Sequence, residues 1–135
     1  IEKHLEAMGV SLAGFEPAAE GYGPMYNLLR GFDSTVERLA GAHFTPEALA
    51  LKKNDQFIEF CERAGAQETA ALYRTHIQPD EGWHVDIGHR FLTRYVASDE
   101  DQGKARRAIE AVLDLAVKVQ RKQFQELKLS HAPGC

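Results

Sequence analysis

Glu81 and His84 place a carboxylate and an imidazole three residues apart, within the stretch Ile77–Gly88. Residues three apart lie on one face of a helix, so these two groups can hold one metal ion. They fall on an apolar stripe with Ile77 and Leu92 that should face the core. Because a buried carboxylate is costly without a partner, a metal ion would explain its place there.

A second carboxylate, Glu47, lies on an apolar stripe of its own upstream. A Glu from one helix and a Glu-x-x-His from the next form half of the ligand set of ferritin-like di-metal bundles. The sequence therefore predicts Glu47, Glu81 and His84 as metal ligands. A Glu-x-x-His also occurs by chance on solvated helices, so a metal-free interpretation stays open.

Two further polar residues lie beside these ligands. His43, one turn before Glu47, is open to three interpretations: a ligand, a partner that orients a ligand, or a core histidine. We favour the orienting role. Asp80 could accept a hydrogen bond from a metal-bound imidazole on a facing helix, and the alternative is an exposed position.

Helical signals place the ligands on two helices. Ser34 and Glu37 form a capping-box pattern, which predicts a helix from 34 to about 52. Pro46 and Pro79 stand shortly before the proposed ligand carboxylates, and each predicts a kink or bulge there. The alternative is that the prolines separate short structural helices.

The remaining elements follow from composition and periodicity. The sequence predicts a crossover loop at 10–24, a short apolar turn at 25–29, a polar turn at 52–56, a short helix at 57–64, a long helix at 67–97, and a last helix at about 101–129 capped by the acidic segment 98–101. Tyr73, Trp83 and Tyr95 are expected to be core or interface aromatics, while His76 and His89 lie off the Glu81 face. No strand pattern is evident, so the fold class is all-α.

Composition bounds the kind of protein. The 135 residues, 44% of them hydrophobic and 27% charged, suit one compact domain. A net charge of −4 gives no support for a nucleic-acid or anionic-membrane surface. The two cysteines form no disulfide framework, and a reducing cytoplasm is the default expectation. No apolar run approaches the length of a membrane span.

The chain opens in the middle of a helical pattern that ends at Gly9, with no capping residue before it. We therefore expect one helical domain at 1–129 that is incomplete at its N-terminus. Residues 130–135 are expected to form a disordered tail.

At this point the chain resembles a known family. The segments Arg38–Ala40, Pro46–Leu51 and Asp80–Gly88 look like the second half of bacterial ferritin-like proteins, in the rubrerythrin-like branch related to the tRNA hydroxylase MiaE. The resemblance implies a ferritin-like bundle, represented here by its second helix pair and an extra C-terminal helix. It also implies that Glu47, Glu81 and His84 bind iron.

The family pattern needs a second Glu and a second Glu-x-x-His. A missing N-terminal half or a second copy of the chain would supply them. Carboxylate and imidazole ligands suit two iron ions, with manganese as the alternative. The expected function is a di-iron oxidoreductase of the oxygenase or hydroxylase type. The alternatives are a ferroxidase or peroxide-scavenging protein, and a metal-free helical interaction module.

Overall fold

The computed structural model describes residues 1–14, 16 and 21–128, and within these ranges it is helical and contains no strand. The all-α prediction is therefore confirmed. The helices are, in chain order, α1 (Glu2–Ala7), α2 (Pro24–Arg30), α3 (Thr35–Glu37), η1 (Arg38–Phe44), α4 (Thr45–Arg63), α5 (Gln67–Leu72), η2 (Tyr73–Ile77), α6 (Gln78–Tyr95) and α7 (Asp99–Leu127).

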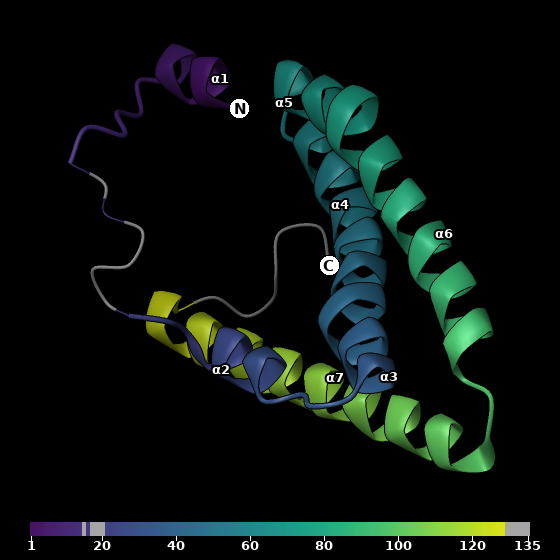
Figure 1. Cartoon of the computed structure of the whole chain (residues 1–135). Helices are drawn as coiled ribbons and strands as arrows, with labels where there is room; N and C mark the ends of the chain where they lie inside the picture. Colours follow the sequence, from purple (N-terminus) through teal and green to yellow (C-terminus); the bar gives the residue numbers. More distant parts are fainter. Residues whose placement is uncertain (15, 17–20, 129–135) are drawn as a thin grey trace.

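A helical hairpin over residues 35–95 forms the frame of the molecule. Its first helix runs through α3, η1 and α4, and its second through α5, η2 and α6. Gly65, in the left-handed region at φ 79°, turns the chain between them. Figure 1 shows α4 and α6 side by side, while α2 lies along α7 in a second arm that meets the hairpin near α3.

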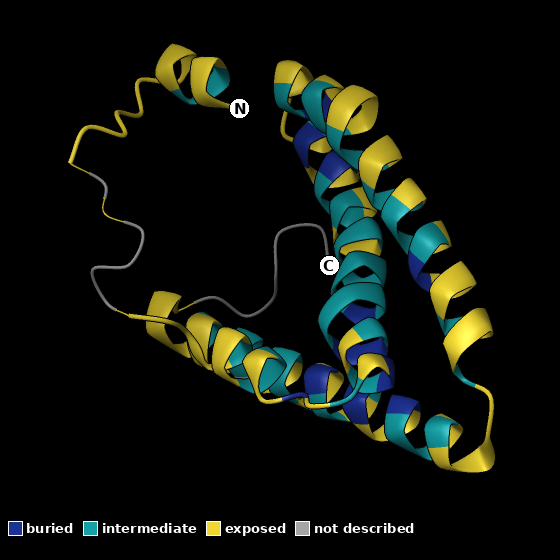
Figure 2. Ribbon diagram, in the orientation of Figure 1, coloured by how far each residue is buried: buried dark blue, intermediate teal, exposed yellow. Residues whose placement is uncertain are grey.

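Two small apolar clusters hold these parts together (Figure 2). The larger lies where the hairpin meets α7, and its buried members are Phe32, Val36, Ala40, Ala105, Ala108 and Val112. The smaller, near the Gly65 turn, contains Ile58, Cys61 and Ala70. The stretch of α4 between the two clusters is only partly buried, and this stretch carries Glu47.

The helix boundaries correct two of the predictions. The polar turn at 52–56 is wrong, because α4 continues through it and includes the short helix expected at 57–64. Its polar side chains are tolerated because several are exposed, while Ile58 and Cys61 anchor the following turns. The apolar turn at 25–29 is the helix α2, which has Pro24 in its first turn.

Other boundaries agree with the sequence. Ser34 and Glu37 form the complete capping box, and Ser98 accepts the backbone N–H of Asp101 at the start of α7. Trp83 and Tyr95 are 62% and 47% exposed, so of the two roles expected for them the core role is excluded and the interface role stays a prediction. The loop expected at 10–24 lies partly, and the tail at 130–135 wholly, outside the described residues.

Both helices of the hairpin contain a π-helical segment that ends two residues before a proline. The last π-type bonds run from the Thr45 N–H to the Ala40 carbonyl and from the Gln78 N–H to the Tyr73 carbonyl. Pro46 follows the first bond and Pro79 the second. A proline ring clashes with the carbonyl four residues earlier, and a wider turn relieves that clash. The predicted bulges are thus confirmed, and neither proline ends its helix.

None of the helices in the described ranges is both long enough and apolar enough to span a membrane. The N-terminal helix α1 lies near α5 (Figure 1), where the imidazole of His4 and the hydroxyl of Thr69 are hydrogen-bonded at 3.0 Å.

Gly41 and Gly82 offer a matched test of packing in the hairpin. A Cβ on Gly41 would lie 2.4 Å from the Phe32 ring and 3.2 Å from Ala108, whereas a Cβ on Gly82 meets no atom within 4 Å. We expect Gly41→Ala to destabilise the protein by about 1–3 kcal/mol through overpacking. Gly82→Ala should instead stabilise it by up to about 1 kcal/mol, because alanine favours helix.

Urea denaturation followed by circular dichroism measures both changes. Equal shifts for the two variants would contradict the tight contact between η1 and Phe32.

Candidate metal centre

The hairpin geometry brings the three predicted ligands together. Glu47 on α4 and the Glu81–His84 pair on α6 lie nearly the same number of residues from the Gly65 turn, on opposite sides of it. Two antiparallel helices therefore place them at the same level. Among the described residues, Glu47, Glu81 and His84 form a group that could hold a metal ion. One donor atom of each side chain lies within 4.8 Å of the donor atoms of the other two.

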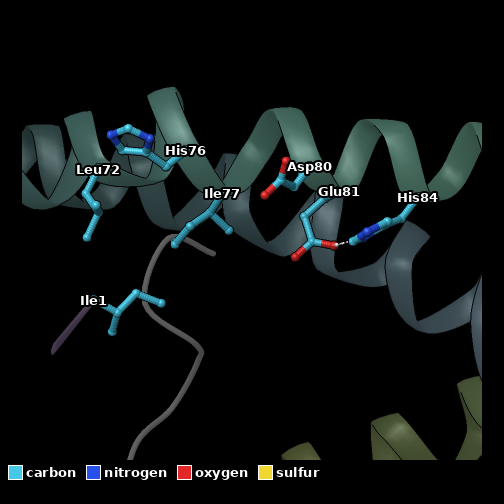
Figure 3. A pocket seen from close by; sticks show the side chains of 7 residues that line it. All are labelled: Ile1, Leu72, His76, Ile77, Asp80, Glu81 and His84. Atoms are coloured by element: carbon cyan, nitrogen blue, oxygen red, sulfur yellow. Dashed lines mark ion pairs between the residues drawn. The ribbon is translucent and has the colours of Figure 1, made fainter.

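The donor distances fit a shared cation better than direct hydrogen bonds. His84 Nδ1 lies 3.6 Å from Glu47 Oε2 and 3.9 Å from Glu81 Oε2 (Figure 3 shows the approach to Glu81). Hydrogen bonds from nitrogen to oxygen span about 2.7–3.2 Å. Donor atoms that each lie roughly 2.0–2.2 Å from one ion are separated by roughly 3–4 Å, depending on the angle between them.

The Nδ1 atom of His84 gives a second indication of a metal site. This atom is buried and has no hydrogen-bond partner among the described residues. Buried polar atoms of native proteins nearly always have one. A metal ion between Nδ1 and the two carboxylates would satisfy it, so the residues present fit a divalent cation.

The two carboxylates repel each other in the metal-free chain. The pKa of Glu81 is raised above its usual 4.5, first by a hydrogen bond shared with Glu47, then by burial, and then by the negative charge of Glu47. A bound cation would oppose this rise in the pKa of Glu81, because a cation favours the charged form of a carboxyl group.

The prolines and their π-helical segments determine where the ligands point. Each π segment adds a residue to one helical turn and so rotates all that follows relative to a regular helix. The Thr45 hydroxyl donates to the Ala40 carbonyl at 2.7 Å and closes the wide turn two residues before Glu47. The Gln78 side-chain amide donates to the Leu51 carbonyl at 2.8 Å and to Asp55 at 2.6 Å, which ties α6 to α4 beside the site.

His43 lies next to the three-residue group but outside it. Its Nδ1 is 3.9 Å from Glu47 Oε1, and its ring meets that of His84 edge-on at 6.4 Å. Its Nε2 is buried without a hydrogen-bond partner among the described residues. Gly88 makes this approach possible, because a Cβ there would lie 3.3 Å from the His43 ring. The orienting role of His43 stays a prediction.

An open pocket of about 540 Å³ adjoins the site. Asp80 is exposed and lines it together with Glu81, His84, Leu72, Ile77 and Ile1 (Figure 3). His76 lines it too, although it was expected to lie off the Glu81 face. Its spacing of four residues from Asp80 was the signal that could have linked it to this face.

The fold and the site define an all-helical protein with a candidate Glu-Glu-His metal centre on a helical hairpin. Comparison of the chain with models of known families, with curated proteins and with solved structures found no significant match. The ferritin-like resemblance and the domain limits at 1–129 therefore stay predictions.

Glu81→Gln tests the repulsion between the two carboxylates. In the metal-free protein at pH 7 we expect this variant to melt at a higher temperature than the wild type, because the raised pKa of Glu81 marks its charge as destabilising. The folded state binds a proton more readily than the unfolded state does. The advantage of the variant should therefore shrink as the pH falls from above the raised pKa toward 4.5.

Thermal melts in excess chelator between pH 4.5 and 8 measure this effect. Asp86→Asn is the control, because Asp86 is exposed on the same helix and pairs with Arg90 at 2.6 Å. If Glu81→Gln melted below the wild type at pH 7, the negative charge of Glu81 would stabilise the metal-free fold, and the repulsion would be refuted.

Proposed function

We propose that this chain binds a transition-metal ion through Glu47, Glu81 and His84, and that it acts as a ferritin-like di-iron oxidoreductase when a second ligand set completes the site. The observation that carries the proposal is the convergence of these three donors between α4 and α6. A Glu facing a Glu-x-x-His is half of the ligand arrangement of di-iron carboxylate bundles.

The donor set favours iron, with manganese as the alternative. Carboxylate and imidazole donors with open coordination positions are typical of non-haem iron, whereas structural zinc and copper sites favour thiolates or more imidazoles. Cys61, a buried thiol, lies near the Gly65 turn in the smaller core cluster and not at the site.

Two ferrous ions in a completed site would supply the electrons that activate O₂. The residues of this chain would have two tasks there. Glu47 and Glu81 would balance the positive charge of the ions, and His84 would fix their position from α6. Leu72 and Ile77 would make the adjoining pocket partly apolar, so that a small organic substrate can approach the centre. An oxygenase or hydroxylase is the leading proposal, and a ferroxidase or peroxide scavenger is the close alternative.

Metal binding by the intact chain is the first test. Under anaerobic conditions we expect the wild type to bind Fe²⁺ and Mn²⁺, as measured by equilibrium dialysis with elemental analysis. His84→Ala and Glu47→Gln should each weaken binding by at least about tenfold to a hundredfold, the loss that even an indirect partner of a ligand causes.

His89→Ala is the matched control, since His89 is exposed one turn beyond the site on the same helix. Circular dichroism checks that each variant is folded. Binding of less than about a tenth of an ion per folded chain would favour the metal-free interaction module. Oxygen uptake by the iron-loaded protein then separates the reactions, because a ferroxidase needs ferrous iron alone and an oxygenase also needs an organic substrate.

A further inference from the structure

We propose that a second copy of this chain docks against the face of the hairpin that bears Glu47, Glu81 and His84, and that a metal ion is required for the docking. The inference rests on the proposed metal binding and names the partner that completes the site. The half ligand set, the surrounding surface and the charge of the site support it independently.

An identical partner would supply the ligands that one chain lacks. One chain offers one Glu and one Glu-x-x-His, and a dinuclear carboxylate site uses two of each. A two-fold axis beside the site would bring the same three donors from the other copy, because a two-fold interface pairs one surface patch with itself. Two helical hairpins would then form the four helices around the metal ions.

The face around the site is open and partly apolar. Glu47, Glu81 and His84 keep 27%, 19% and 40% of their side-chain surface exposed. Two turns beyond His84, and therefore on the same face of α6, Phe91 is 44% exposed. Trp83, in ring contact with His84 at 5.5 Å, is also exposed. Aromatic side chains exposed beside a polar site are typical of an interface.

The exposed area is large enough for such an interface. The chain exposes 9675 Å², whereas a compact monomer of 15.1 kDa exposes about 7,000 Å². Part of the excess belongs to residues 8–14 and 21–24, which are exposed. A standard interface removes only about 800 Å² from each partner, which is roughly a third of the excess.

Charge makes the docking depend on metal. Asp80, Glu47 and Glu81 give this face three carboxylates, and the facing copy would add three more. His43, His76 and His84 are basic groups beside them, and all three are also duplicated. Without a cation, six acidic groups would be brought together in a partly dehydrated interface, which opposes association. Two divalent ions would offset four of these charges.

Sedimentation velocity with Co²⁺ as an air-stable probe tests the proposal on the whole chain. We expect monomer in excess chelator, and dimer with one ion per chain when Co²⁺ is added. Phe91→Lys should leave the three donors in place and weaken dimer formation by about tenfold or more, because it places a charge in the interface. The matched control is Leu113→Lys on α7, whose side chain is 39% exposed.

The outcomes separate this inference from the proposed function. If the wild type binds Co²⁺ and stays monomeric at every concentration tested, the second copy is excluded while the metal site stands. If the folded protein binds no Co²⁺, the metal proposal itself fails. Equal dimerisation with and without the ion would refute the requirement for a metal ion. Equal loss of dimer in the Phe91→Lys and Leu113→Lys variants would show that the contact lies elsewhere.

Discussion

The repulsion between Glu47 and Glu81 is the constraint on which the rest of the site depends. The two carboxylates share a partly buried space between helices, where the hydrogen bond from Glu81 to Glu47, desolvation and the negative charge of Glu47 together raise the pKa of Glu81. The fold holds them there, although a metal-free chain would be more stable with one of them neutral. Such an arrangement is expected where a cation is part of the folded state, because each carboxylate is then attracted to the ion and the repulsion between the two is offset.

Position along the hairpin makes this repulsion unavoidable. Glu47 and Glu81 face each other because their helices are antiparallel and their distances from the Gly65 turn are nearly equal. The Gln78 amide then holds the two helices together by bonding to the Leu51 carbonyl and to Asp55. Since the apolar clusters lie on either side of the site along the hairpin, the two helices cannot separate at the site without disturbing the packing of one cluster or the other.

The sequence was informative where a local rule applied. Ser34 with Glu37 predicted a helix start, Pro46 and Pro79 predicted bulges, and the spacing of Glu81 and His84 predicted a shared face. It failed at 52–56, where a polar run was interpreted as a turn although the packing of Ile58 and Cys61 extends the helix. Whether the bundle is ferritin-like depends on how helix pairs associate, and that depends on contacts that periodicity within one helix does not contain.

The π-helical segments explain how prolines can stand so close to the candidate ligands. A proline within a regular helix distorts the turn before it. Here that turn is already wide, and the Ala40 carbonyl accepts from both the N–H and the hydroxyl of Thr45. The distortion is therefore confined to the turn before the ligand. Beyond it, α4 and α6 are regular, so the three-residue spacing from Glu81 to His84 keeps both groups on one face. A helix broken at Pro79 would leave that pair on a mobile end, whereas a helix that continues through the proline holds it opposite Glu47.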